Sequence, residues 1–369
     1  MPPTGPEGSA PACTAPEHHA NAPDLTCTSG TCGTNSPIVN NFPINGLSKR
    51  ADGACNASGV QLLAHSLEGG GCGKAADLEL DPGGTRLIGM RNGQVVCTGE
   101  QLAGATFLVR SFASSALAFT IASVRPIITL DGRAQYEGYR IESGGVPACD
   151  SAAALSIRRK LGLVDTEAPV GALPKPVGDP SGPPDDLVIA VDGPLYDRAD
   201  KLIPGSQDRW FNLACARDSL AKRSLYGLYT PGDDATNETA LHMLTANYCG
   251  KPYTVPGVEL EWEAHSIPKL RQEEALWHGG KAICIDTPRL MTLAAGNNPI
   301  APADLPAQLQ PRGCAGQNCD ADRWTQALLA ECRLPTCKKL SGMPPPQFEF
   351  DSFDFKTDQN QIIVGVAKH

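Results

Sequence analysis

Residues 104–124 read GATFLVRSFASSALAFTIASV and hold two short apolar runs, 104–110 and 117–124, on either side of a stretch of small residues. Runs of this length with β-branched and aromatic residues are typical of β-strands. A third alternating run follows at 137–142, after the turn signal Asp131-Gly132. Short strands joined by turns predict an antiparallel sheet or a small barrel in this part of the chain.

The sequence after these strands mixes strand and helix patterns. A short helix is predicted at 151–161, and the many prolines and glycines of 169–184 mark a linker or a long surface loop. A strand is predicted at 186–191, whereas 210–215 carries both strand and helix signals. The segment 258–264 (VELEWEA) alternates strictly and predicts a strand with its glutamates on one face.

The clearest helical pattern covers 236–249, where apolar residues recur at helical spacing. Thr236 or Asn237 is suited to cap its first turn, and Gly250 is suited to end it. A further helix is predicted at 320–331.

Together these patterns predict an α+β fold that is β-rich, with an antiparallel sheet and a few short helices, stapled by disulfides. The predicted segments are a flexible cysteine-containing tether (1–45), a β-rich subdomain (46–162), a Pro/Gly-rich linker or loop (163–186), an α+β subdomain (187–340) and a tail (341–369). The alternating FEFDSFDF sequence of the tail favours an edge strand.

Cysteine is the residue type that says most about the compartment of this protein. The chain has 14 cysteines, an even number: Cys13, Cys27, Cys32, Cys55, Cys72, Cys97, Cys149, Cys215, Cys249, Cys284, Cys314, Cys319, Cys332 and Cys337. Such a set indicates a disulfide framework in an oxidising compartment, so we expect essentially all of them to be paired. The last four leave zinc open as an alternative, but their pairwise spacing and the other cysteines favour disulfides.

Charge and hydropathy argue against several classes of partner. The formal net charge is -9 and the longest basic run is 158–160, so neither nucleic acid nor an anionic membrane is an expected partner. No apolar stretch approaches the roughly 18 residues of a transmembrane helix, and the start MPPTGPEGSAPAC lacks the features of a signal peptide. Because an oxidised protein has to be exported, we expect a mature or truncated form, or a true start that lies upstream.

Few patterns point to catalysis or to a cofactor. The segment 69–74 (GGGCGK) resembles a phosphate-binding loop superficially, but Glu68 and Ala75 stand where that loop needs glycine and a hydroxyl. Glu259 and Glu261, about 7 Å apart on one strand face, suit an acid–base pair or a cation, yet a solvated strand face has the same alternation. The seven histidines show no metal-binding spacing. We therefore predict no catalytic residue, metal site or cofactor.

Four blocks of sequence resemble a known family. They are TANYCG (245–250), FNLACARDSLAK (211–222), EALWHGGKAIC (274–284) and GEQLAGATF (99–107). In order and spacing they resemble the ADYC-domain proteins, a bacterial family named for its Ala-Asp-Tyr-Cys motif. Ala246, Tyr248 and Cys249 fit that motif, and Asn247 stands where the family has Asp. The resemblance spans about 99–289 and implies an exported protein of the cell envelope, but no activity, because the function of the family is unknown.

The resemblance also implies disulfide pairings. Cys149, Cys215, Cys249 and Cys284 belong with the similar segment and are expected to pair among themselves, and Cys314, Cys319, Cys332 and Cys337 within the C-terminal block. The family pattern has cysteines at the positions of Arg223 and Ala240, and their joint absence implies that these two positions are neighbours. The motif residues Tyr248 and Cys249 are expected to staple the end of the 236–249 helix to the sheet.

These observations favour an extracytoplasmic, disulfide-stabilised envelope, surface or binding protein over an enzyme. The alternative is a secreted hydrolase that uses the strand carboxylates Glu259 and Glu261. An enzyme needs a concave pocket in which a carboxylate, histidine or cysteine is partly buried, so the surroundings of such groups separate the two hypotheses.

Overall fold

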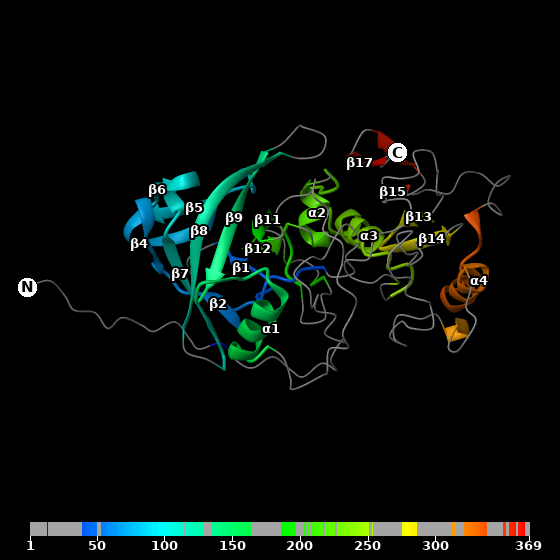
Figure 1. The fold of residues 1–369 in the computed structure, drawn as a ribbon, viewed down its shortest axis with the longest axis horizontal. Helices are drawn as coiled ribbons and strands as arrows, with labels where there is room; N and C mark the ends of the chain where they lie inside the picture. Colours follow the sequence, from blue (N-terminus) through cyan, green and yellow to red (C-terminus); the bar gives the residue numbers. More distant parts are fainter. Residues whose placement is uncertain are drawn as a thin grey trace, which may run out of the picture.

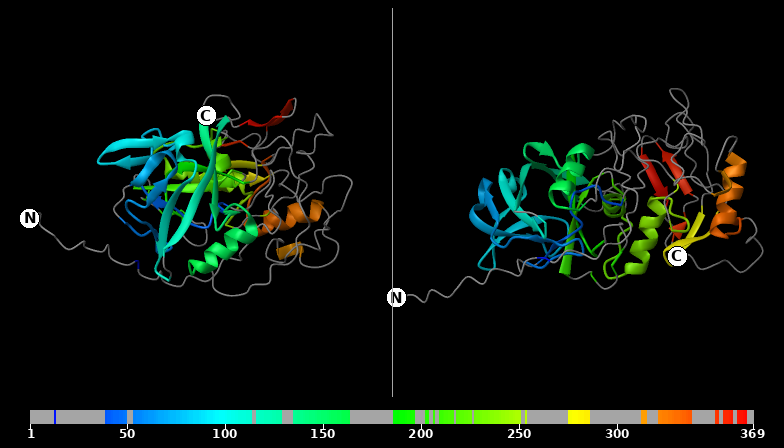
Figure 2. Two further views of the ribbon diagram at one scale, coloured as in Figure 1. Left: turned by 60° about the vertical axis from the view of Figure 1, so that its left-hand side comes forward. Right: turned by 90° about the horizontal axis from the view of Figure 1, so that it is seen from below.

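A computed structural model shows one large antiparallel sheet at one end of the molecule and the C-terminal helix at the other (Figure 1). The structure describes residues 13, 39–49, 53–113, 116–128, 135–163, 186–196, 202–203, 206, 209–216, 218–225, 227–250, 253, 275–285, 312–314, 321–337, 350–351, 354–358 and 361–365. Along the long axis, the sheet is followed by helices α2 and α3, then by strands β13 and β14, and finally by α4 (Figures 1 and 2).

The large sheet has twelve strands, in the order β1-β12-β11-β9-β8-β7-β3-β4-β5-β6, with β10 paired to β9 and β2 paired to β7. The strands are β1 (Leu47–Ser48), β2 (Val60–Leu62), β3 (Leu67–Gly69), β4 (Gly73–Leu80), β5 (Leu87–Arg91), β6 (Gln94–Thr98), β7 (Ala105–Ser111), β8 (Leu117–Ile128), β9 (Gln135–Ser143), β10 (Val146–Pro147), β11 (Leu187–Asp192) and β12 (Trp210–Cys215). All of their pairings are antiparallel, which confirms the predicted fold class.

The remaining elements form two small sheets and a set of short helices. The sheets have the orders β14-β13-β15 and β16-β17, from β13 (Ala275–His278), β14 (Lys281–Ile285), β15 (Phe350–Asp351), β16 (Asp354–Asp358) and β17 (Gln361–Gly365). The helices are α1 (Ser151–Lys160), α2 (Ser219–Leu225), α3 (Asp234–Leu244) and α4 (Ala321–Cys332), with short 3-10 turns η1 (Gly70–Cys72), η2 (Gly99–Leu102) and η6 (Arg312–Cys314). None of the described helices is long and apolar enough to cross a membrane.

The three predicted neighbouring strands are β7, β8 and β9, and alternation decides which of their side chains enter the core. On β7 the buried residues alternate with half-buried ones along the whole strand. Phe107 lies opposite Phe119 of β8, and their rings stack at a centroid distance of 5.4 Å. Phe42 adds a third ring, 5.8 Å from that of Phe119. This aromatic group lies within the main core of the sheet.

Strands β11 and β12 are buried on both faces. Val188 and Ala190 join the main core, whereas Ile189 and Val191 join a second cluster on the opposite face of β11, because successive side chains of a strand point to opposite sides. The α1 residue Ile157 belongs to the main core, whereas α2 supplies residues to the second cluster. The sheet is therefore covered by helices on both sides here. Burial on both faces also explains why 210–215 showed no clear strand alternation.

Helix α3 differs at both ends from the predicted helix at 236–249. Its N-cap is Asp233, whose carboxylate accepts hydrogen bonds from the backbone N–H and the hydroxyl of Thr236. A capping carboxylate satisfies donors that the first turn leaves free. The helix ends at Leu244, before the motif, so Tyr248 and Cys249 lie in the turn that follows and not in the last helical turn as predicted.

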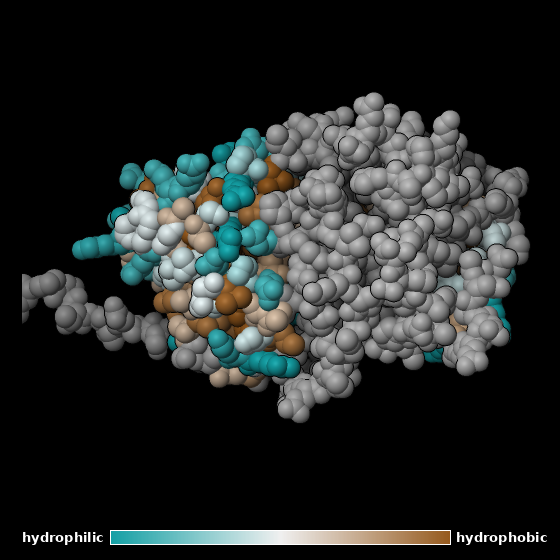
Figure 3. All heavy atoms as spheres, viewed as in Figure 1, coloured by the Kyte–Doolittle hydropathy of each residue, from teal (hydrophilic) through white to brown (hydrophobic). Residues whose placement is uncertain are grey.

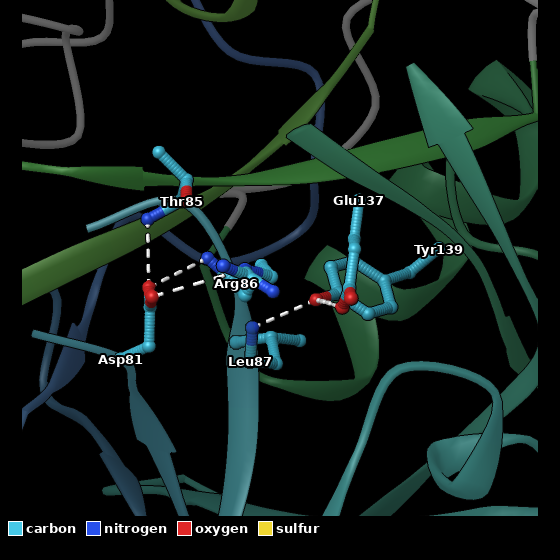
Figure 4. A network of polar contacts seen from close by, with 6 residues as sticks. All are labelled: Asp81, Thr85, Arg86, Leu87, Glu137 and Tyr139. Carbon is cyan, nitrogen blue, oxygen red and sulfur yellow. Dashed lines mark hydrogen bonds and ion pairs between the residues drawn. The ribbon is translucent and has the colours of Figure 1, made fainter. Parts of the chain in front are cut away.

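A polar network ties the β4–β5 hairpin to β9 (Figure 4). Asp81 accepts hydrogen bonds from the backbone N–H groups of Thr85 and Arg86, both at 2.9 Å, and so closes the turn between the two strands. The buried Tyr139 hydroxyl donates to Glu137 at 2.6 Å and accepts from the Leu87 backbone N–H at 2.7 Å. Burial, reinforced by the hydrogen bond to Glu137, raises the pKa of Tyr139, so its phenol stays protonated.

The described part of the surface intersperses hydrophilic and hydrophobic side chains on the face seen in Figure 3. Its exposed large hydrophobic residues are Val95 and Val146, which lie on different strands. Single exposed apolar residues are ordinary on protein surfaces and do not mark a docking site.

Candidate functional site

The candidate site is built on the motif turn, residues 245–250 (TANYCG), which follows α3. Thr245 ends the helix by donating from its hydroxyl to the Leu241 carbonyl at 2.9 Å. Ala246 then adopts a left-handed conformation, with φ of 51°, which turns the chain back. The Asn247 side-chain oxygen accepts a hydrogen bond from the Gly250 N–H at 2.7 Å and closes the turn. The first half of the motif therefore acts as a helix stop and a tight turn.

Tyr248 fixes the motif turn to the β13–β14 sheet. Its side chain is fully buried, and its ring stacks on that of Trp277 at a centroid distance of 5.3 Å. The ring of Tyr253 lies 6.1 Å away, and the Tyr248 carbonyl accepts a hydrogen bond from Ala282 of β14. Trp324 and Leu328 of α4 complete this cluster, so one core holds α3, the small sheet and α4 together.

Cys249 is the exposed end of the motif and forms a disulfide with Cys332, the last residue of α4. The bond borders an open hollow of about 630 Å³. The hollow is lined by Cys249, Gly250, Tyr253, Arg312, Gly313, Ala327, Ala330, Glu331 and Arg333. Three separate parts of the sequence thus meet at the motif cysteine, 249–253, 312–313 and 327–333.

The charges around the hollow are unequal. Tyr253 is hydrogen-bonded to Glu331, and Glu331 also accepts from the Arg312 backbone N–H at 2.6 Å. Burial, followed by the charge of Glu331, raises the pKa of Tyr253. The guanidinium groups of Arg312 and Arg333 form no hydrogen bond or ion pair with any residue that the structure describes. Among the described residues that line the hollow, two exposed cations therefore accompany one carboxylate that already has partners, an excess of positive charge in a negatively charged protein.

The observed disulfides correct the expected connectivity. The described bonds are Cys13–Cys55, Cys72–Cys97, Cys149–Cys215, Cys249–Cys332 and Cys284–Cys337. Cys149 does pair with Cys215, but Cys249 and Cys284 pair with the C-terminal block and not with each other. The prediction failed because it followed sequence neighbourhood, whereas the core around Tyr248 and Trp277 brings the C-terminal segment against the motif. Every cysteine that the structure describes is oxidised; Cys27, Cys32 and Cys319 lie outside that part.

The other sequence candidates contribute no described site. Glu259 and Glu261 lie outside the described residues. In the 69–74 segment, Cys72 is buried and bonded to Cys97, and the Gly70 backbone lies against the 101–103 loop, so this glycine run is a packed turn. Cys332 and Cys337 are in disulfides and are not zinc ligands, and the described residues contain no group of metal-ligating side chains. No sequence pattern indicated the hollow, because its lining residues come from separate parts of the chain.

A second unusual feature lies between the large sheet and α3. Arg223 of α2 is fully buried, although a buried cation is costly without a counter-charge. Its Nη1 donates to the Tyr196 hydroxyl at 3.2 Å, and its guanidinium carbon lies 4.9 Å from the centre of the Tyr229 ring. Its Nε and Nη2 atoms have no hydrogen-bond partner. The cation–π contact offsets part of the desolvation cost.

Comparison with known families found a match to the central part of the chain. Residues 168–291 match the model of the ADYC domain, and the matched segment contains the motif turn. The GEQLAGATF block at 99–107 lies outside the matched residues, although the sequence resemblance had included it. The three cysteines of the matched region all pair with cysteines outside it. Neither the curated proteins nor the solved structures contained a match to this chain.

Proposed function

We propose that this ADYC-domain protein is an extracytoplasmic binding protein whose hollow beside the motif turn takes a small anionic ligand. A carboxylate or phosphate group is the part of the ligand that the protein recognises. The observation that carries the proposal is the pair Arg312 and Arg333, which both line the hollow and whose guanidinium groups have no hydrogen-bond or ion-pair partner among the described residues. Guanidinium groups suit planar anions because they donate several hydrogen bonds in a fixed geometry.

The walls of the hollow fit a ligand that is larger than a simple ion. Tyr253 presents an aromatic ring, and Ala327 and Ala330 present the side of α4. A ligand with an apolar part next to its acidic group can use both kinds of surface. The Cys249–Cys332 bond and the buried aromatic cluster hold these walls in place before a ligand arrives, which reduces the entropic cost of binding.

The disulfides support the extracytoplasmic assignment. Disulfide frameworks persist in oxidising compartments and are rare where glutathione keeps thiols reduced.

Binding also fits the residues of the hollow better than hydrolysis does. Among the described lining residues, the acid Glu331 is engaged by Tyr253 and by the Arg312 backbone, and Cys249 is oxidised. The lining residues that the structure describes do not include a nucleophile paired with a base.

The test is calorimetric titration of the oxidised protein with citrate and, separately, with inorganic phosphate. We expect saturable binding of at least one probe, weakening as salt is added because exposed charges are screened. Arg312→Gln combined with Arg333→Gln should weaken binding at least tenfold. Arg159→Gln combined with Lys160→Gln, an equal charge change at two exposed positions of α1, is the matched control and should bind as the parent does. Absence of saturable binding of both probes, or equal binding by the two variants, would overturn the proposal.

A further inference from the structure

The Cys249–Cys332 bond differs from the other described disulfides in its exposure. Cys249 is exposed and Cys332 is half-buried, whereas each of the other described bonds contains at least one buried cysteine. Cys149 and Cys215, for example, are 5% and 4% exposed. A thiolate has to reach a sulfur atom along the axis of the disulfide, so access is a first requirement for exchange.

The surroundings of the bond suit the charge that exchange creates. The described residues that line the hollow beside it include the cations Arg312 and Arg333 and the engaged acid Glu331, an excess of one positive charge among them. Positive charge attracts an incoming thiolate and stabilises the thiolate that leaves. The Tyr253 hydroxyl oxygen lies 3.7 Å from Cys249 Sγ and 4.0 Å from Cys332 Sγ, within reach of either sulfur.

The fold has other contacts that hold α4 if this bond opens. Trp324 and Leu328 remain buried in the core that contains Trp277. The Cys284–Cys337 bond lies a few residues beyond α4 and keeps the end of this segment attached to β14. Cleavage of Cys249–Cys332 would therefore release the last turn of α4 from the motif turn, while Trp324 and Leu328 of α4 stay in the core that contains Trp277.

We propose that Cys249–Cys332 is a thiol–disulfide exchange site that a dithiol reduces selectively while the remaining disulfides stay closed. One thiolate of the dithiol attacks Cys249 Sγ, forms a mixed disulfide there and expels Cys332 as a thiolate, which takes up a proton. The second thiolate of the dithiol then attacks the dithiol's other sulfur atom, the one bonded to Cys249 Sγ. This step closes the dithiol into a disulfide and releases Cys249 as a thiolate, which takes up a proton. The protein gains two electrons and two protons, and the dithiol loses them.

The first test measures the rate of opening of each bond in the folded protein. The oxidised protein is treated with dithiothreitol, samples are quenched with iodoacetamide at intervals, and labelled cysteines are quantified by peptide mass spectrometry. We expect Cys249 and Cys332 to be labelled together, at least tenfold faster than Cys149 and Cys215. Simultaneous opening of all bonds, or earlier opening of any other described bond, would overturn the proposal. The assay contains no anionic ligand, so its failure leaves the anion titration unaffected.

The second test determines whether the cations Arg312 and Arg333, and not exposure of the bond alone, make Cys249–Cys332 reactive. Arg312→Gln with Arg333→Gln should slow the opening of Cys249–Cys332 at least threefold, and the control variant Arg159→Gln with Lys160→Gln should leave the rate unchanged. High salt should remove the difference between these variants, because the cations act through charge. Near-ultraviolet circular dichroism of the selectively reduced protein should keep its aromatic signal, since Tyr248 and Trp277 remain stacked. Equal rates in the Arg312/Arg333 variant and in the α1 control variant, or loss of the aromatic signal on reduction, would overturn the proposal.

Discussion

The rings of Tyr248 and Trp277 stack at a centroid distance of 5.3 Å, and both side chains are fully buried. The tyrosine of the family motif is thus the contact between the motif turn and the small sheet. Its position explains how a turn outside any regular element comes to organise the core that holds α4.

Replacing the motif tyrosine by alanine should strongly destabilise this part of the fold. Tyr248→Ala removes a buried ring and leaves a cavity against Trp277, which typically costs about 3–5 kcal/mol. Tyr248→Phe keeps the ring and should cost no more than about 1.5 kcal/mol. Urea unfolding gives both values, with the exposed Val95→Ala as a control expected within about 0.5 kcal/mol of the parent. Equal stabilities of the alanine and phenylalanine variants would contradict the role assigned to the stack.

The departure of Asn247 from the family motif should be nearly neutral. Its oxygen accepts a hydrogen bond from the Gly250 N–H, and an aspartate oxygen accepts the same bond. We expect Asn247→Asp to leave the free energy of unfolding within about 0.5 kcal/mol of the parent, and Asn247→Ala to lower it by about 1 kcal/mol. The same urea series measures both. If Asn247→Asp proved as unstable as Asn247→Ala, the turn would need the amide and not merely an acceptor.

Removing the Tyr139 hydroxyl should lower the free energy of unfolding. This hydroxyl bridges the Leu87 N–H and Glu137, so Tyr139→Phe leaves a buried backbone donor without its acceptor (Figure 4). An unsatisfied buried donor costs about 1–3 kcal/mol. Thermal or urea unfolding measures the loss, and hydrogen exchange of the Leu87 amide should accelerate in the variant. An unchanged exchange rate at Leu87 would show that the hydroxyl does not protect it.

Alkaline pH should destabilise the protein through its buried phenols. Burial, followed by the charge of Asp192, raises the pKa of Tyr229 to about 12. The unfolded chain loses this proton near pH 10, so between about pH 10 and 12 the folded state holds more protons than the unfolded state. The free energy of unfolding therefore falls as pH rises through that window. Tyr229→Phe should make the fall shallower in rapid urea unfolding measurements, and an identical slope in parent and variant would refute this.

The two positions where the family pattern has cysteines remain a testable pair. Helices α2 and α3, which carry Arg223 and Ala240, pack against each other, as a bond between these positions requires. Arg223→Cys together with Ala240→Cys should oxidise spontaneously and stabilise the fold by about 2–4 kcal/mol. It also removes a buried guanidinium with two unpaired nitrogen atoms. Alkylation of the denatured, unreduced variant reports the bond, with each single change as a control. Two persistent free thiols would show that the positions are not paired in relatives.

Local patterns in the sequence predicted some of the elements, among them four strands of the large sheet and three helices, and little of their assembly. Strands β7, β8, β9 and β11 and helices α1 and α4 lie close to their predicted ranges, because alternation and helical spacing are properties of single segments. The end of α3 was misplaced because Ala246 in a left-handed conformation stops it, and alanine carries no signal for such a stop. The pairing of Cys249 with Cys332 and the convergence of Arg312 and Arg333 depend on tertiary packing, which no spacing rule encodes.

Disulfides connect the ADYC-matched segment to the sequence on both sides of it, so the matched segment and the folding unit have different limits. The matched residues 168–291 contain three cysteines, and each has its partner outside these limits. Their first strand, β11, also takes its neighbour β9 from the preceding sequence. A fragment cut at the family boundaries would carry an odd number of unpaired thiols and an open sheet edge, a combination that invites intermolecular bonding. The matched segment is therefore the centre of a larger folding unit, whose outer parts supply the disulfide partners of those three cysteines.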